Sequence, residues 1–443
     1  MTSLQGMPSL ESEHLRLMPV YLASRINNHN DALRARGVDV IDMGMGNPVD
    51  PVLSHVVTAL REALGDPANH RYAPATGIKP LKEAFARHYG RHFGVALDPT
   101  REIICGIGSK EIYSHLCLAI LGPHDACVMP TPAYTPHLYA PQIADAHVVG
   151  LFMQEETPGP GLLGAIKQTF ETVRPRPKFV VLNFPHNPTA RTVDLAFFEE
   201  IVSLAHTYKF WVLNDLAYGH TVFEEYKAPS LLQAKNAKDV AVEMFTMSKP
   251  YSMAGWRVGF LAGNHQLIDA VSRIKPYYDY GHFAAVQLAA AVALDTGDEY
   301  IRQQCRTYQK RRDALLSGLA HNNWGKTIKQ HATMFSWQPL PGRFHSMGSV
   351  EFCMKLAEEA GVSFFPGAGF GAEGEGFVRV ALVETEARIH EACTRIGKFL
   401  RGAAPPLTLP SPPGGEGRVR GHARPHPHKE EPQRTVTTAT GGE

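Results

Sequence analysis

The sequence has 443 residues, of which 44% are hydrophobic and 20% charged, and its formal net charge is +1. This length and composition predict a soluble globular protein of two or three domains with a large buried core. Because the net charge is small and no apolar run is long enough to span a bilayer, we expect neither a nucleic acid nor a membrane as a partner.

The cysteines and the N-terminal stretch bear on the cellular location. The six cysteines are scattered and form no C-x-x-C pair, which argues against a zinc site or a disulfide framework and is typical of a reducing cytoplasm. The first residues include Glu11 and Glu13 and lack the apolar core of a secretory signal. We therefore expect a cytoplasmic protein without a bound metal.

Apolar runs of strand length alternate with amphipathic helical runs, and this alternation predicts an α/β domain with a mainly parallel sheet. The expected strands are 102–108, 179–184, 210–215 and 258–263, and the expected helices include 109–121 and 193–209. Long helical patterns follow after about residue 290. We expect an N-terminal arm (1–25), a first part of a small domain (26–49), a large domain (50–290) and a small α+β C-terminal domain (291–402).

Residues 403–443 differ in composition from the rest of the chain. They are rich in proline and glycine and contain no aromatic residue, so they cannot bury enough apolar surface to offset the entropy lost on ordering. We expect a disordered tail. His422, His426 and His428 in this tail could bind a metal adventitiously, but a solvated tail is the preferred interpretation.

Unusual polar residues stand where the predicted strands end, which is where doubly wound sheets bind ligands. Asn187 follows one strand, Asp215 ends another, and Tyr218 lies three residues later. Residues 106–110 form a glycine turn before a helix N-terminus, whose free N–H groups favour an anion. Each feature alone has an ordinary interpretation as a cap or turn. Together they supply an acid, a phenol, an amide and a phosphate cradle.

The stretch "FTMSKPYSMAGWRVGF" (245–260) places Lys249 among apolar residues. A buried ammonium is costly, and a salt bridge, an anion site or a covalent lysine with a lowered pKa would each explain it. Pyridoxal phosphate needs all the groups found here: an amine for its aldehyde, a carboxylate for its ring nitrogen, donors for its phenolic oxygen, and hydroxyls with an arginine for its phosphate. We therefore favour covalent use of Lys249.

Several sequence blocks resemble the class I and II aminotransferases of fold type I. The blocks are "NPT" (187–189), "NDLAY" (214–218), "SKPYSMAGWRVGF" (248–260), "GMGNP" (44–48), "RYAPATGIKPLKEA" (71–84), "GIGSKE" (106–111), "PTPAY" (130–134), "FPGAGFG" (365–371) and "VRVAL" (378–382). They come in the family's order, and the resemblance is strongest to bacterial alanine-synthesising (glutamate–pyruvate) transaminases. It implies a seven-stranded sheet in the large domain and pyridoxal 5'-phosphate as the cofactor.

The resemblance also implies roles for residues at the cofactor. Lys249 would hold the cofactor as a Schiff base and move the proton between the substrate's Cα and C4′ of the cofactor. Asp215 would pair with the ring nitrogen, Tyr218 and Asn187 would bind the phenolic oxygen, and Tyr134 would stack on the ring. The residues implied around the phosphate are Ser109, Lys110, Thr246, Ser248 and Arg257.

Further implied roles concern the substrate and a second subunit. Arg379 would grip the substrate's α-carboxylate, with Asn187 and the Gly46 backbone beside it. Tyr21 would cover the site from the N-terminal segment. Tyr72 would enter the phosphate site of a neighbouring subunit, which implies a homodimer.

Two positions depart from the family pattern without touching a reacting atom. Ala190 stands where the family often has the glycine of N-P-T-G. Thr246 replaces the first serine of Ser-x-Ser-Lys and keeps the hydroxyl.

Three functions compete at this stage: an aminotransferase, a β-lyase or other carbanion enzyme on the same fold, and a non-catalytic cofactor-binding regulator. Aminotransfer is preferred, because the chain keeps Lys249 and Asp215 and has no helix-turn-helix extension. We find no second arginine for a dicarboxylate side chain, and "YYDYGHF" (277–283) favours a small or apolar amino acid such as alanine, with glutamate or 2-oxoglutarate as the other partner. Aspartate, methionine and aromatic substrates remain open.

Overall fold

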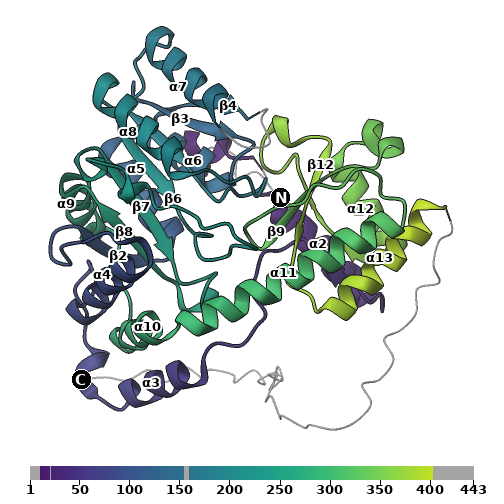
Figure 1. Ribbon diagram of the computed structural model, residues 1–443, viewed down its shortest axis with the longest axis horizontal. Coiled ribbons are helices and arrows are strands. Elements are labelled where there is room, and N and C mark those ends of the chain that lie inside the picture. The colour runs from purple at the N-terminus through teal and green to yellow at the C-terminus, as the bar shows by residue number, and fades with distance from the viewer. Residues whose placement is uncertain (1–9, 20, 154–158, 403–443) are drawn as a thin grey trace, which may run out of the picture. The chain divides into compact units, whose positions relative to one another are not determined.

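The computed structural model describes residues 10–19, 21–153 and 159–402 (Figure 1). The expected disordered tail with its three histidines, and residues 1–9 of the expected N-terminal arm, lie outside the described residues. Within the described ranges, no helix is both long enough and apolar enough to cross a membrane. All six cysteines are free thiols.

A seven-stranded sheet forms the centre of the α/β part, with the order β2-β8-β7-β6-β5-β3-β4. Every neighbouring pair is parallel except the two pairs made by β8, which runs antiparallel to both β2 and β7. The strands are β2 (Ile103–Ile107), β3 (Ala126–Thr131), β4 (His147–Phe152), β5 (Phe179–Leu182), β6 (Trp211–Asp215), β7 (Ala241–Thr246) and β8 (Val258–Gly263). The predicted α/β class with a mainly parallel sheet is confirmed.

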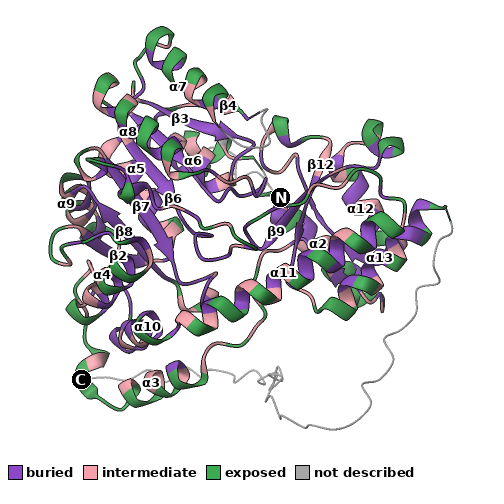
Figure 2. Cartoon of the chain, in the orientation of Figure 1, coloured by how far each residue is buried: buried purple, intermediate pink, exposed green. Residues whose placement is uncertain are grey.

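Helices cover both faces of this sheet, which explains why its central strands are continuous apolar runs. In β5, Phe179 and Val181 pack on one helical layer, and Val180 and Leu182 pack on the other. The first layer contains α5 (Ser109–Ile120), α6 (Thr135–Ile143) and α9 (His265–Ile274). The second contains α3 (Ser54–Leu64), α4 (Lys79–Phe93), α7 (Pro160–Thr172), α8 (Leu195–Tyr208) and α10 (Ala284–Thr296). Figure 2 shows the buried sheet and the exposed outer faces of α3, α4, α7 and α8.

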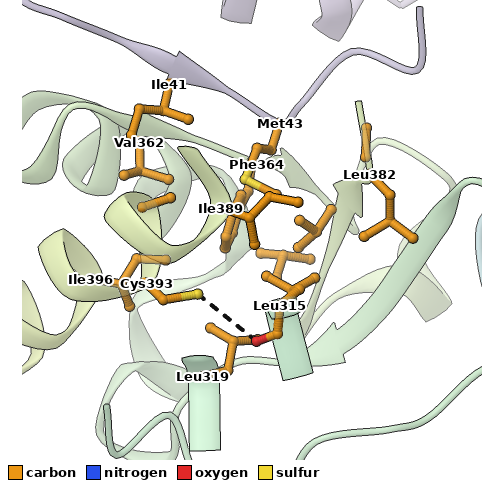
Figure 3. Close-up of a cluster of buried hydrophobic side chains, with 14 of the residues drawn as sticks. Ile41, Met43, Leu315, Leu319, Val362, Phe364, Leu382, Ile389, Cys393 and Ile396 are labelled. Carbon is orange, nitrogen blue, oxygen red and sulfur yellow. Dashed lines mark hydrogen bonds between the residues drawn. The ribbon is translucent and has the colours of Figure 1, made fainter. Parts of the chain in front are cut away.

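A second core joins the start of the described chain to its end (Figure 3). Ile41 pairs with Val362 across a two-stranded parallel sheet, and Met43 packs in the same cluster as Phe364 and Leu315. Each such side chain contributes roughly 1.5–3 kcal/mol when fully buried. The elements are β1 (Ile41–Asp42), α12 (Ser349–Ala360), β10 (Val362–Ser363), α13 (Glu386–Leu400), and the antiparallel sheet of β11 (Phe365–Pro366), β12 (Phe377–Ala381) and β9 (Phe335–Pro339). Helix α2 (Leu22–Ala35) packs against α12. A short helix α1 (Glu13–Leu17) precedes them.

Helix α11 (Asp298–His321) spans the two cores (Figure 1). Its Ile301 packs with α10 on the large sheet, and its Leu315 and Leu319 belong to the second core. The whole of α10 packs against α3 and α4, so the large-domain boundary expected at residue 290 lies inside a helix. The alanine-rich face of α10 buries closely against its neighbours, which keeps residues 291–296 with the large sheet.

Candidate active site

A cavity of about 760 Å³ lies at the carboxyl ends of β5, β6 and β7, where β12 also reaches it. Thirteen of the fourteen residues predicted from the sequence line this cavity. They are Tyr21, Gly46, Ser109, Lys110, Tyr134, Asn187, Asp215, Tyr218, Thr246, Ser248, Lys249, Arg257 and Arg379. Residues separated by more than 300 positions therefore meet at one site, and Tyr72 is the exception.

Lys249 follows β7 in a turn and points into the cavity. Its Nζ donates to the Gly46 carbonyl oxygen at 2.6 Å, and within the described part of the chain it forms no ion pair with a carboxylate. Burial, with smaller contributions from the positive charges of Arg379 and Arg257, lowers the pKa of Lys249 to about 8. A salt bridge therefore does not explain this lysine, and roughly a tenth of its amine is uncharged at pH 7.

Two glycines let a guanidinium and a helix N-terminus converge at one end of the cavity. Gly108, with φ of +82°, is the N-cap of α5, and a Cβ there would lie 2.2 Å from Nη2 of Arg257. A Cβ on Gly259 would lie 2.5 Å from the Ser109 backbone nitrogen. Only glycine allows both approaches, and the result is a cradle for an anion.

Two hydroxyls border the same cradle. Thr246 Oγ1 and Ser248 Oγ lie 2.9 Å apart, and the Ser248 backbone N–H donates to Thr246 Oγ1 at 3.2 Å. Both side chains are buried and line the cavity. The threonine that departs from the family's serine therefore places its hydroxyl at the cradle.

Asp215 lies at the end of β6 with its carboxylate held on two sides. Its Oδ1 accepts from the Ala217 backbone N–H at 3.1 Å, and its Oδ2 accepts from His137 Nε2 at 3.0 Å. Asp215 is 5% exposed. A buried carboxylate fixed in this way still has lone pairs for a further donor from the cavity.

Sequence reasoning missed two residues that orient this site. His137, on α6, contacts the Asp215 carboxylate, and Asn183 donates from Nδ2 to the Asp215 carbonyl oxygen at 2.7 Å. Asn183 also accepts from the Asn187 backbone N–H at 2.9 Å. His137 lies three positions after Tyr134, and Asn183 lies four positions before Asn187. This closeness in sequence to predicted site residues was the one available signal, and it does not indicate a contact with Asp215.

Arg379, on β12, is 6% exposed and has no carboxylate partner among the described residues. Its Nη1 donates to Asn187 Oδ1 at 2.9 Å and its Nη2 to the Gly44 carbonyl oxygen at 3.3 Å, but its Nε is buried without a partner. Burial lowers the pKa of Arg379 to about 10. A buried cation with unused donors is costly alone and is suited to bind a carboxylate from the cavity.

Three aromatic rings enclose this guanidinium. The distance from its Cζ to the ring centroid is 4.0 Å for Phe335, 4.7 Å for Phe370 and 5.2 Å for Phe365. These cation–π contacts offset part of the cost of burying the charge and hold its plane in place. Gly46 borders the same ring of Phe335, and a Cβ on Gly46 would lie 2.5 Å from it.

Two phenols face the cavity in their protonated form. Burial raises the pKa of Tyr134 to about 12. Burial also raises the pKa of Tyr218 well above its ordinary value. Both hydroxyls can therefore donate a hydrogen bond at neutral pH.

The remaining predicted residues lie at or beyond the cavity rim. Tyr21 is 50% exposed, and the Lys110 Nζ lies 5.8 Å from the centroid of its ring. Tyr72 is 87% exposed and does not line the cavity, and its ring centroid is 5.0 Å from that of Tyr280.

The family model of aminotransferases of class I and II matches residues 38–396. The chain belongs to this family. It is 41% identical over 384 residues to the glutamate-pyruvate aminotransferase AlaC of Escherichia coli K12, covering 87% of this chain and 92% of that protein. It is 37% identical over 390 residues to an LL-diaminopimelate aminotransferase of Moorella thermoacetica, covering 88% and 98%. The substrate-bound structure of BacF from Bacillus subtilis superposes with a TM-score of 0.82 at 31% identity, covering 89% and 98%.

Members of this family use pyridoxal 5'-phosphate, and the aminotransferase has a site whose chemistry fits that cofactor. The glycine-bordered cradle suits a phosphate dianion, the fixed Asp215 suits a protonated ring nitrogen, and the Lys249 amine suits an aldehyde. The predicted cofactor is thereby confirmed at the level of the family.

Proposed function

We propose that this aminotransferase exchanges amino groups between L-alanine and 2-oxoglutarate, giving pyruvate and glutamate, with Lys249 as the catalytic residue. The observation that carries the proposal is the Lys249 amine, with a pKa of about 8, in the same cavity as a buried Arg379 that has no carboxylate partner. One group suits covalent and proton-transfer chemistry, and the other suits the α-carboxylate common to all amino acids.

The bound cofactor supplies an aldehyde that condenses with amines and a ring that withdraws electrons from the substrate's α-carbon. Lys249, freed from its hydrogen bond to Gly46, would take a proton from the substrate's α-carbon and deliver it to C4′ of the cofactor. Asp215, oriented by His137, would keep the ring nitrogen protonated. Proton transfer needs an amine that can move, and a lasting charge partner for the ring nitrogen needs a carboxylate that is fixed.

The remaining donors would hold the two anionic ends of the ligands. Ser109, Thr246, Ser248 and Arg257, with the α5 N-terminus, would bind the phosphate. Tyr218 and Asn187 would donate to the phenolic oxygen, and Tyr134 would pack on the ring. Two parallel hydrogen bonds from Arg379 would fix the substrate's carboxylate and so direct its α-hydrogen toward Lys249.

The choice of alanine is supported by the charges that line the cavity. Among the described lining residues, the only arginines are Arg257 and Arg379, and both already have a proposed anion. Because no further guanidinium lines the described part of the cavity to pair with a side-chain carboxylate, a substrate with a small uncharged side chain fits best. For 2-oxoglutarate, the exposed ammonium of Lys110 at the rim is available to the distal carboxylate.

The LL-diaminopimelate aminotransferase relative makes diaminopimelate a second candidate substrate. Its distal end carries an ammonium as well as a carboxylate, and the ammonium would need an acid. Among the described residues lining this chain's cavity, Asp215 is the only acid, and it is already held by His137. Alanine is therefore the preferred substrate.

We also propose that the active form is a cytoplasmic homodimer in which Tyr72 reaches the other subunit's phosphate site. Tyr72 and its neighbour Tyr280 are 87% and 59% exposed, and Tyr277 is 89% exposed. Exposed aromatic side chains grouped in this way favour an interface. The six free cysteines are consistent with a reducing compartment.

A panel of single amino acids tests the substrate. Added to the cofactor-bound enzyme, alanine and glutamate should remove the visible absorption band within one turnover, and LL-diaminopimelate should do so far more slowly. A faster response to LL-diaminopimelate, aspartate, methionine or an aromatic amino acid would overturn the choice of alanine. Release of ammonia with pyruvate from cysteine, at a rate above aminotransfer, would instead indicate a β-lyase.

Substitution of Lys110 tests the proposed distal contact. An exposed ion pair is worth about 1 kcal/mol, so Lys110→Gln should raise the KM for 2-oxoglutarate roughly fivefold and leave the KM for alanine unchanged. Lys110→Arg keeps the charge and is the matched control. A loss of cofactor affinity without a change in either KM would assign Lys110 to the phosphate instead.

A further inference from the structure

A cluster of three histidines lies outside the active-site cavity. His88 and His92 are one helical turn apart on α4, and His220 follows β6. One ring nitrogen of each histidine lies within 4.8 Å of those of the other two. The Nε2 atoms of His88 and His220 are 2.8 Å apart and share a hydrogen bond.

The rings of His88 and His220 are enclosed in the apolar core, and His92 is half-buried at its edge. His88 is fully buried and His220 is 8% exposed, and the Phe245 ring packs against both. Burial lowers the pKa of His88, and it lowers the pKa of His220 to about 3.

Two polar groups orient the rings from outside the cluster. Asp298, in the first turn of α11, accepts from His92 Nε2 at 2.9 Å. The Tyr251 hydroxyl lies 3.4 Å from His88 Nδ1, which leaves His88 Nε2 turned toward His220. Metal-binding histidines commonly donate the second ring N–H to a carboxylate, a backbone carbonyl or a water, and Asp298 supplies the carboxylate for His92.

We propose that His88, His92 and His220 form a binding site for a divalent transition metal ion, with Zn²⁺ as the ion that the donor set fits best. Three imidazole nitrogens are a recognised zinc donor set, and a water completes the tetrahedron. Two nitrogens on one tetrahedral zinc lie roughly 3.3 Å apart. The His88–His220 pair, now at 2.8 Å, would have to open by about half an ångström, which side-chain rotation can provide.

A second cluster that combines a histidine with carboxylates serves as an internal contrast. Glu111, His115 and Asp279 also lie within 4.8 Å of one another. The buried Lys275 ammonium already occupies that cluster, with Nζ at 2.8 Å from Glu111 and 2.6 Å from Asp279. A cation is therefore present there as a side chain, whereas no lysine or arginine donates to the ring nitrogens of the three histidines in the described part of the chain.

The metal would join three segments of the fold. His88 and His92 belong to α4, His220 lies two residues after Tyr218 of the cavity, and Asp298 begins the helix that spans both cores. A bound ion would cross-link these segments and stabilise the folded protein by mass action. None of the three histidines lines the active-site cavity, so metal binding there does not depend on which substrate the enzyme uses.

The test uses the full-length, cofactor-bound enzyme in which His422, His426 and His428 are all replaced by alanine, so that the tail cannot contribute metal ligands. We expect titration calorimetry with ZnCl₂ to give one ion per chain, and Co²⁺ to give the intense visible bands of a tetrahedral site. We expect His92→Gln, a partly exposed position, to weaken Zn²⁺ binding at least tenfold. We expect Asp298→Asn to weaken binding 10- to 100-fold through loss of orientation. His115→Gln in the contrast cluster is the matched control and should leave binding unchanged.

Thermal unfolding provides a second readout. Zn²⁺ should raise the Tm of the parent enzyme and of His115→Gln but not that of His92→Gln, whose folding is checked by its cofactor absorption band. Absence of Zn²⁺ binding in the parent, or equal affinity in His92→Gln and the parent, would overturn the proposal. The three rings would then form a hydrogen-bonded core cluster only.

Discussion

Replacement of Arg379 by alanine should strongly lower the enzyme's activity toward alanine and lower the unfolding free energy only a little. The guanidinium is 6% exposed, uses Nη1 and Nη2 within the protein at 2.9 and 3.3 Å, and leaves Nε without a partner. A carboxylate in the cavity would receive two charge-assisted hydrogen bonds. At roughly 1.5–3 kcal/mol each, they amount to about 3–6 kcal/mol of transition-state binding.

The expected result follows from that sum. Arg379→Ala should lower kcat/KM for alanine roughly 10²- to 10⁴-fold, since each 1.4 kcal/mol corresponds to a factor of ten. Steady-state kinetics with alanine and 2-oxoglutarate measures it. A loss of less than tenfold would refute the role of Arg379 as the carboxylate ligand.

Arg311 supplies a matched control for stability. It is also 6% exposed, but its Nη1 and Nη2 both donate to the Asp50 carboxylate at 2.8 Å. Arg311→Ala leaves a carboxylate unpaired and should cost about 3 kcal/mol of unfolding free energy. Arg379→Ala breaks no ion pair and should cost less. A larger loss of stability in Arg379→Ala would show that this arginine mainly supports the fold.

Three other changes have defined outcomes. The pKa of Lys249 is lowered to about 8 in the folded apoenzyme and is near 10.5 in the unfolded chain, so the unfolded state binds more protons between these pH values. The unfolding free energy should therefore rise by up to roughly 3 kcal/mol from pH 8 to 10.5. Urea titrations should find this rise missing in Lys249→Met. His137→Phe removes a 3.0 Å hydrogen bond to the Asp215 carboxylate and should lower kcat roughly 10- to 100-fold with little change in KM for alanine, whereas an unchanged kcat would make His137 structural only. Ala190 has a φ of 57°, which is strained for any residue but glycine. Ala190→Gly should therefore raise the unfolding free energy by up to about 1 kcal/mol, measured by urea titration, and leave kcat/KM unchanged. A lower unfolding free energy would contradict the strain at this position.

The sequence predicted the parts of this site that short motifs specify. Lys249, Thr246, Ser248 and Arg257 lie within one short segment, and the resemblance of that segment to the aminotransferases implied an amine beside a phosphate site. Asp215 alone has an ordinary interpretation as a cap or turn residue, and it was predictable only in combination with the other polar residues at the strand ends. The α/β class was predictable because fully buried parallel strands appear as uninterrupted apolar runs.

Contacts between distant segments were not predictable in the same way. His137 is separated from Asp215 by 78 positions, and nothing local to either residue indicates that they touch. The H-x-x-x-H spacing of His88 and His92 is visible in the sequence, but His220 joins them only through the packing of α4 against the turn after β6. The end of the large domain was placed inside α10 because an alanine-rich helix carries little information about which core it joins.

Identification of the lysine that holds the cofactor tests the central claim most directly. The cofactor-bound enzyme is reduced with borohydride, digested and analysed by mass spectrometry. We expect the peptide containing Lys249 to carry the mass of the reduced cofactor, and Lys249→Ala to carry no label and show no catalytic turnover. A label on another lysine, or turnover of alanine that survives Lys249→Ala, would contradict the account.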